Sequence, residues 1–280
     1  MSPNKMTRRD FIKLAGTTSL GAVLAACVPT PTPAPTTAPP TLAPASPTAL
    51  PKPKRGGVLR IIPPDVVTQF DPMMAGTAAE LDAMCAAYDN LATRMVAEKD
   101  EPIRPGLAES WDYSQDGQSY TFKLRKGVTF HHGKPFTAKD VEFTFQRIQA
   151  PKSGSQYASH LRMLSKIEVV DDYTIRFILK EPDVTFLYRI SAAGFWIVPS
   201  DRTAEQLAKE PSGTGPFKLA QYTAGERLVF KRNEQYWDKE LPYLDELQFS
   251  FISESAAQLA ALTSGSVDIV DQVGIENLAQ

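Results

Sequence analysis

The sequence predicts a mixed α/β fold with much antiparallel sheet, formed by residues 55–280 and preceded by an export leader and a linker. Three observations predict this organisation. The first 27 residues have the pattern of a secretion signal. Ten of the 23 prolines in the 280-residue chain fall between Val28 and Lys54. Beyond residue 54, strand-like segments outnumber helical ones, and many neighbouring strands are separated by short turns.

The charge of the chain excludes a large class of functions. It holds 30 Lys and Arg residues against 32 Asp and Glu residues, a net charge of −2. A protein that binds the phosphate backbone of a nucleic acid needs a broad basic surface. We therefore expect no nucleic-acid partner. Two cysteines are also too few for a disulfide scaffold.

Residues 1–27 are interpreted as a signal peptide, in which a basic stretch precedes a weakly apolar run that ends at Cys27. The run of about 13 residues is too short to cross a bilayer, which takes about 20. The stretch around Arg8 and Arg9 resembles a twin-arginine export signal, and Leu24-Ala-Ala-Cys27 resembles a bacterial lipobox. We expect Cys27 to carry a lipid. The alternative is an amphipathic helix with a buried Cys27.

Residues 28–54 are interpreted as a Pro- and Thr-rich linker without charge before Lys52. Such a composition cannot bury a core and favours polyproline II, which could reach roughly 80 Å from a membrane. With Cys27 lipidated, Cys85 has no partner for a disulfide. We expect Cys85 to behave as a small buried hydrophobic residue.

The first part of the folded region is predicted to start with a strand at 56–62, followed by a turn at Asp71-Pro72. From Thr77 to about Val96, apolar residues recur at helical spacing, which predicts a helix. Strands at 108–113 and 119–125 flank Asp116-Gly117, a strong hairpin signal. Apolar and polar residues alternate in the second of these strands, so one face is expected to be buried through Tyr120, Phe122 and Leu124.

The next predicted helix starts after the N-cap Thr137 and runs to about Gln149, with an apolar stripe of Val141, Phe145 and Ile148. A second hairpin joins 167–170 to 174–179. The remaining expected elements are a short helix near Phe186, a strand at 195–198, a short helix at 203–210, strands at 217–223, 226–232 and 246–252, a helix at 255–264 and a strand at 267–270. In the helix at 255–264, the residues expected to be buried are Ala256, Leu259, Ala260 and Leu262.

Catalytic and metal-binding motifs are missing from the sequence. It contains no Gly-x-Ser-x-Gly, no His-Glu-x-x-His, no phosphate-binding loop and no Cys-x-x-Cys. His131 and His132 would face opposite sides of a strand and could not easily share one metal. Gly213-Thr-Gly-Pro-Phe217 is predicted to be a tight turn before a strand. We expect no enzyme, no metal and no cofactor; a site of two histidines and a carboxylate is the alternative.

Tryptophan is the residue type best suited to stack on a ligand, and the chain has three. Trp111 lies in a predicted hairpin and Trp237 near a turn, so both are predicted to be packing residues. Trp196 follows Ala192-Ala-Gly194 and is the stronger candidate for a binding site.

A series of short segments, spread along residues 56–269, carries a family resemblance. They are Gly56-Gly-x-Leu-Arg-Ile61, Asp71-Pro72, Leu107–Trp111, Asp116–Arg125, Gly127–Ala138, Asp140-Val141, Val169–Thr174, Gly213–Phe217, Arg232–Trp237 and Ser264–Ile269. In this order they resemble the extracytoplasmic solute-binding proteins of family 5, the dipeptide, oligopeptide and nickel receptors of ABC importers. One departure is His132, where the family usually has Asp.

The resemblance implies a periplasmic-binding-protein-like fold of type II, with mixed sheets and two lobes that close over a ligand, and no catalysis. The residues of the first lobe that it places at the cleft are Ala75, Gly76, Thr77, Tyr157, Phe195 and Trp196. For Tyr157 the alternative is a tyrosine that packs against a helix.

The resemblance and the leader together predict a substrate-binding lipoprotein of an ABC importer, which captures peptides outside the cytoplasmic membrane. Its partners would be the permease and ATPase subunits, and a lipid anchor would hold it at the membrane, in the periplasmic space. Nickel complexes, oligosaccharides or another small solute are alternative cargoes. An envelope hydrolase and a structural lipoprotein are the remaining alternatives.

The length of the chain leads to one more expectation. A full receptor of this family is nearly twice as long, so residues 55–280 are expected to carry mainly the first lobe, without the second. Half of a cleft loses the closure that makes contacts strong. We therefore expect this chain to bind no peptide tightly, to be only marginally stable, and to have an unpaired sheet edge.

Overall fold

The structure is a computed structural model that describes residues 53–94 and 103–272. The chain divides into two units, residues 1–51 and 52–280, and the description concerns the second. The predicted signal peptide with Arg8, Arg9 and Cys27 lies outside the described residues, as does nearly all of the predicted linker. Among the helices described, none is long and apolar enough to cross a membrane.

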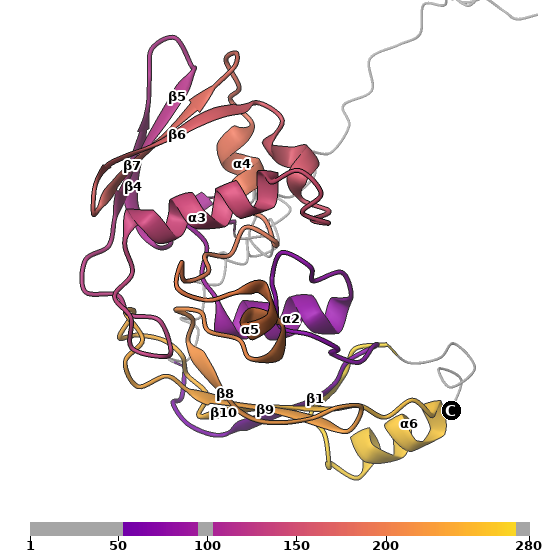
Figure 1. The fold of residues 1–280 in the computed structure, drawn as a ribbon. Coiled ribbons are helices and arrows are strands. Elements are labelled where there is room, and N and C mark those ends of the chain that lie inside the picture. The colour runs from indigo at the N-terminus through magenta and orange to yellow at the C-terminus, as the bar shows by residue number, and fades with distance from the viewer. Residues whose placement is uncertain (1–52, 95–102, 273–280) are drawn as a thin grey trace, which may run out of the picture. The chain divides into compact units, whose positions relative to one another are not determined.

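One of the two larger sheets has five strands in the order β11-β1-β10-β9-β8 (Figure 1). Strand β1 runs parallel to both of its neighbours, and the other pairs are antiparallel. Leu59 of β1 lies opposite Leu247 of β10. The strands are β1 (Val58–Ile62), β8 (Phe217–Thr223), β9 (Arg227–Arg232), β10 (Glu246–Ser250) and β11 (Ile269–Val270).

The other larger sheet has four antiparallel strands in the order β4-β5-β7-β6. Both predicted hairpins are present, and Gly117 at the first turn has φ +69°, which favours glycine. The alternation in β5 buries one face, because Tyr120, Phe122 and Leu124 are at most 4% exposed. The strands are β4 (Ala108–Tyr113), β5 (Ser119–Leu124), β6 (Leu164–Asp171) and β7 (Thr174–Leu179).

Helix α3 (Ala138–Gln149) covers the four-stranded sheet and contacts β6 and β7 (Figure 1). Its start is a capping box of Thr137 and Asp140, as the predicted N-cap requires. Its apolar stripe, Val141, Phe145 and Ile148, is at most 1% exposed and lies in the same core as the buried face of β5. A second core forms between helix α2 (Ala78–Ala87) and the five-stranded sheet.

Helix α2 is shorter than the predicted helix, which was expected to reach about Val96. It ends at Ala87, Tyr88 adopts an extended conformation, and β2 (Ala92–Arg94) pairs with β3 (Ile103–Pro105) instead. The reason is tertiary. The backbone oxygen of Asp89 accepts a hydrogen bond from the nitrogen of Ile197 at 3.0 Å, so the chain leaves the helix where this bond begins.

The strand predicted at 195–198 is wrong. Among the residues that the structure describes, this segment pairs with no strand. Ile197 donates its N–H to Asp89, and the nitrogen of Val198 donates to Oγ1 of Thr144 at 3.0 Å. Its backbone is therefore satisfied by a loop and by a helix side chain rather than by a ladder.

Helix α6 (Ser255–Thr263) is present, but the predicted burial of its side chains is wrong. None of its residues is buried, and Leu262 is 37% exposed. The helix packs beside β11, the two-residue edge strand of the five-stranded sheet. The short helices α4 (Phe186–Ile190) and α5 (Ala204–Lys209) lie where the sequence predicted them, and a 3₁₀ turn spans Ala158–Leu161.

One further expectation is corrected by the structure. Cys85 is exposed rather than buried, because it faces a hollow of the protein surface. Desolvation within that hollow, with the nearby carboxylate of Asp82, still raises the pKa of the Cys85 thiol to about 11. His131 and His132 lie in a turn. Within residues 53–94 and 103–272, no group of three or more His, Cys, Asp or Glu side chains has the arrangement of a metal site.

Candidate functional site

The loop before α2 carries three of the six predicted site residues, Ala75, Gly76 and Thr77. Thr77 is the N-cap of α2 and accepts a hydrogen bond from the nitrogen of Glu80 at 3.3 Å. The carboxylate of Glu80 in turn accepts from the nitrogens of Gly76 and Thr77 at 3.1 and 3.4 Å. This reciprocal capping box fixes the shape of the loop.

Glu80 is a buried carboxylate, 4% exposed, and it is fully engaged by hydrogen bonds. Its Oε1 also accepts from the hydroxyl of Thr68 at 2.7 Å. Burial by itself raises the pKa of Glu80. The hydrogen bonds from Thr68, Gly76 and Thr77 outweigh burial, and the net pKa is lowered. The loop is therefore held by a charged group that the protein keeps ionised.

Tyr157 lies across this loop, although it is 80 residues away in the sequence. Its hydroxyl donates to the backbone oxygen of Ala75 at 2.9 Å, and the amide of Gln156 donates to the same oxygen. Burial raises the pKa of the Tyr157 hydroxyl, so this group is a hydrogen-bond donor at neutral pH. The segment that carries Tyr157 thus closes on Ala75 from the side of the four-stranded sheet.

Phe195 and Trp196 complete the predicted set, but their side chains are buried. Phe195 is 1% exposed and packs between the rings of Tyr157 and Phe145, with centroid distances of 5.8 and 5.9 Å. Trp196 is 5% exposed and belongs to the core under the five-stranded sheet. These two residues support the site from below. The accessible part of the set is Gly76, which is exposed, together with the partly buried Thr77 and Tyr157.

An ion pair joins the same loop to helix α3. Arg147 donates from Nη1 to Oδ1 of Asp71 at 2.9 Å, and from Nη2 to Oδ2 in a second, shorter bond. The Asp71 side chain is 3% exposed and the Arg147 side chain 14%. Oδ1 of Asp71 also accepts from the nitrogen of Met73 at 3.2 Å. The carboxylate therefore organises the turn and ties it to the helix.

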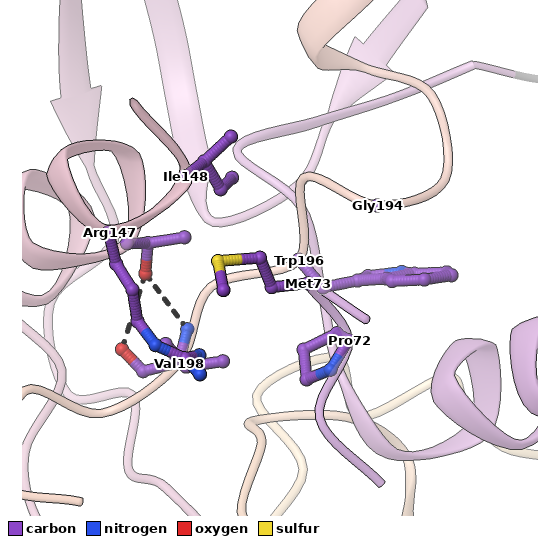
Figure 2. Close-up of a pocket in the computed structure, with 8 residues that line it drawn as sticks. Pro72, Met73, Arg147, Ile148, Gly194, Trp196 and Val198 are labelled. Carbon is purple, nitrogen blue, oxygen red and sulfur yellow. Dashed lines mark hydrogen bonds between the residues drawn. The ribbon is translucent and has the colours of Figure 1, made fainter. Parts of the chain in front are cut away.

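Figure 2 shows the interior beside this ion pair. The side chain of Met73 extends into the space between Ile148 of α3 and Val198, and Trp196 borders the same space. The cavity left there is about 10 Å³. A cavity of this size holds one water molecule at most. It is a packing gap between the loop and α3 and not a ligand site.

The glycine-rich turn at 213–217 is a close-packing element, as predicted. A β-carbon added to Gly213 would lie 2.0 Å from the oxygen of Ala87, and one added to Gly215 would lie 2.5 Å from the carbonyl carbon of Ala87. The nitrogen of Gly215 donates to the oxygen of Ala87 at 3.0 Å. The glycines therefore let the turn approach the end of α2 closely, and Phe217 then begins β8.

Sequence reasoning missed the residues that hold the site together. One of them could have been found, because Thr77-x-x-Glu80 is a capping-box pattern directly before an apolar helix. Arg147 and Gln156 gave no such signal. Their partners are far away in the chain, and no local periodicity connects them.

Comparison with known proteins identifies the family to which the chain belongs. The family described as bacterial extracellular solute-binding proteins, family 5 Middle, matches residues 102–280. The di/tripeptide-binding protein 1 of Pseudomonas aeruginosa is 33% identical over 226 residues, which cover 71% of this chain and 42% of that protein. The heme-binding protein A of Haemophilus influenzae is 35% identical over 203 residues, 64% of this chain and 37% of that protein.

Solved structures agree with the fold. The ABC transporter-associated periplasmic binding protein DppA from Helicobacter pylori, in complex with the peptide STSA, superposes with a TM-score of 0.73 at 30% identity. The match covers 81% of this chain and 49% of that one. The chain thus spans less than half the length of each of these relatives. The two sheets and their helices correspond to part of a type II periplasmic binding protein.

Proposed function

The chain belongs to the family 5 bacterial extracellular solute-binding proteins, and on this premise we propose that it captures peptides outside the cytoplasmic membrane for an ABC importer. The proposal assigns it a binding role and no catalysis. The permease and ATPase subunits of the importer would be its partners. Since the matched relatives are more than twice as long as the aligned segment, the activity of a whole receptor is part of the proposal.

One observation carries the proposal: the exposed Gly76 and the partly buried Thr77 lie beside Tyr157, whose hydroxyl contacts the oxygen of the buried Ala75. Backbone groups and an aromatic hydroxyl lie together there, and Gly76 exposes its backbone. Groups of this kind can bind the main chain of a peptide without reading its sequence. No charged side chain is among the six proposed site residues, so the charged ends of a peptide would be bound by other groups.

The proposal also covers export of the protein and its attachment to the membrane. Cys27 would carry a lipid, and Arg8 and Arg9 would direct export of the folded chain. The lipobox pattern and the arginine pair in the sequence support this part. Residues 28–54 would separate the receptor from the membrane surface.

Another small solute is the alternative cargo. The observation that favours it is the match to heme-binding protein A, whose name gives a ligand that is not a peptide. The two proposals place the ligand at the same site and differ in whether it is a peptide or another small solute. A direct comparison of probes therefore decides between them.

The experiment is an NMR titration of the 280-residue protein with isotope-labelled backbone. The probes are trialanine, hemin, maltotriose and a nickel–histidine complex. We expect trialanine to shift the amide signals of Gly76 and Thr77 and the ring signals of Tyr157, with weak affinity. The matched variant Tyr157→Phe keeps the ring and removes the hydroxyl, and it should lower the affinity by about tenfold.

The outcomes separate the alternatives. Shifts at these residues with hemin, maltotriose or the nickel complex, but not with trialanine, would replace peptide by that solute. Shifts with trialanine that all lie far from Gly76, Thr77 and Tyr157 would contradict the site. No shift with any of the four probes would contradict the receptor proposal for this loop.

A further inference from the structure

The side chain of Gln156 lies at the peptide site, although it is not among the six residues proposed for that site. Gln156 is exposed and directly precedes Tyr157. Its Nε2 donates to the backbone oxygen of Ala75 at 2.5 Å and to the hydroxyl of Tyr157 at 3.2 Å. A β-carbon built on Gly76 would lie 3.7 Å from the same nitrogen. The amide of Gln156 therefore lies beside the exposed backbone of Gly76.

The contact with Ala75 fixes which way the amide of Gln156 is turned. A backbone oxygen can only accept a hydrogen bond, so the nitrogen of the amide has to face Ala75. Oε1 then lies on the other side of the amide, and none of the residues that the structure describes donates to it. Because the side chain is exposed, a donor of a ligand can take the place of water at this oxygen.

The other polar groups of the loop already have partners. The nitrogens of Gly76 and Thr77 donate to the carboxylate of Glu80. The oxygen of Ala75 accepts from Gln156 and from Tyr157, whose hydroxyl also accepts from Gln156. A peptide at this site thus finds the two backbone N–H groups occupied and an acceptor at Oε1 of Gln156.

The charge around the loop also favours a donor from the ligand. Burial is the main cause that raises the pKa of Tyr157; the hydrogen bond from Gln156 opposes it, and the negative charge of Glu80 adds to it. The effect of Glu80 therefore reaches the hydroxyl that contacts Gln156. A negative field of this kind attracts the positive end of an N–H dipole and repels a carbonyl oxygen.

We propose that Oε1 of Gln156 accepts a hydrogen bond from a main-chain amide N–H of the bound peptide. The inference rests on the proposed function, because it assigns a further ligand contact at the same site. It makes Gln156 a specificity-determining residue: a peptide bond offers an N–H to Oε1, and an ester bond of similar shape does not. The hydroxyl of Tyr157 helps to hold the amide in the orientation that presents Oε1.

The test uses the 280-residue protein and three matched ligands, titrated with NMR detection of the loop. Trialanine has an amide N–H at each of its two peptide bonds. Two ester analogues each replace one of these N–H groups by oxygen and leave the rest of the molecule unchanged. We expect one of the two analogues to bind about tenfold more weakly than trialanine, because it lacks the donor for Oε1.

Two variants assign this loss to Gln156. Gln156→Met keeps the length of the side chain without the amide, and the oxygen of Ala75 keeps the hydroxyl of Tyr157 as a donor. Gln221, an exposed residue of β8, gives the matched control Gln221→Met. We expect Gln156→Met to bind trialanine about tenfold more weakly and to bind the weaker analogue as well as it binds trialanine. Gln221→Met should behave as the unaltered protein, and near-ultraviolet circular dichroism checks that both variants are folded.

The comparison of ligands separates a contact from a supporting role. If Gln156 only shapes the loop, Gln156→Met weakens trialanine and both analogues by the same factor, and the analogue that binds weakly to the unaltered protein still binds more weakly than trialanine. That result overturns the proposal. Equal binding of all three ligands by the unaltered protein, or unchanged trialanine binding by Gln156→Met, overturns it as well.

Failure of the proposed function gives a different result. Trialanine would then shift no signal of Gly76, Thr77 or Tyr157 in the unaltered protein. Binding of trialanine at these residues without a difference between peptide and ester contradicts only the role of Gln156 and leaves the peptide site in place.

Discussion

The ring of Tyr157 lies directly over the α-carbon of Gly194. A β-carbon added at Gly194 would lie 2.3 Å from two atoms of that ring, and Gly194 has φ +93°. Steric space and backbone conformation therefore both require glycine here. The contact fixes the position from which the Tyr157 hydroxyl reaches the oxygen of Ala75, so this glycine helps to position the proposed peptide site.

We predict that Gly194→Ala lowers the free energy of unfolding by about 2–4 kcal/mol, since a positive φ and an overpacked contact add together. Urea unfolding measures this. The control is Gly225→Ala, where φ is +74° but no atom lies within 4 Å of the added carbon. That variant should lose only about 1 kcal/mol. An equal loss of unfolding free energy in both variants would show that the Tyr157 ring moves aside at little cost, and would contradict the prediction.

Removing the cation of the buried ion pair should be strongly destabilising. We expect Arg147→Gln to cost about 3–5 kcal/mol in urea unfolding, because it leaves the Asp71 carboxylate buried without its partner. Arg55→Gln removes an exposed pair with Glu240 and should cost less than about 1 kcal/mol. The double variant Asp71→Asn with Arg147→Gln should be less harmful than Arg147→Gln alone. A double variant that is worse would contradict the burial argument.

We predict that protonation of the buried His131 lowers the stability of the protein at acidic pH. Burial is the main cause that lowers its pKa to about 4; the nearby Lys218 adds to the effect, and the hydrogen bond to the oxygen of Gly215 opposes it. The unfolded chain binds a proton near pH 6.5 and the folded chain near pH 4. The contribution of neutral His131 to the free energy of unfolding is therefore complete above about pH 6.5 and is lost as the pH falls toward about 4.

The measurement for His131 compares two proteins at two pH values. Between about pH 7 and about pH 4, the unaltered protein should lose roughly 2–3 kcal/mol more than His131→Gln, which keeps a donor for Gly215. Carboxylates contribute to both curves and cancel in the difference. If the free energy of unfolding falls by the same amount in both proteins, protonation of His131 does not destabilise the folded state, and the prediction is wrong.

Lipid attachment is expected at Cys27. The unaltered protein should partition into the detergent phase of a cell extract, and Cys27→Ala should remain in the aqueous phase, because a thiol is the group that takes the lipid. Mass spectrometry of the N-terminal peptide checks the acyl chains. Recovery of both proteins in the same phase, without acyl mass on Cys27, would refute the anchor.

Export through the twin-arginine route is expected to depend on Arg8 and Arg9. Replacing both by Lys keeps the charge but removes the guanidinium groups, and precursor should then accumulate in the cytoplasm. Fractionation with an antibody measures the ratio of precursor to mature protein. Unchanged export of the double variant would indicate the general secretory route.

Most local elements could be predicted from the sequence. Residues 119–124 alternate strictly and follow a hairpin turn, and the helix at 138–149 has both a cap and an apolar stripe. In such segments the information lies within a few residues, because side-chain period and turn chemistry decide the backbone. The family resemblance was also readable, since it rests on short motifs in a fixed order.

Tertiary structure alone decided where α2 ends, which groups accept the backbone hydrogen bonds of residues 195–198, and which residue lies under the ring of Tyr157. The apolar spacing continues past Ala87, yet the oxygen of Asp89 pairs with Ile197, more than a hundred residues away. The same holds for the joining of Asp71 to Arg147. Each of these depends on desolvated polar groups finding partners across the fold, and a linear pattern of residues does not contain that pairing.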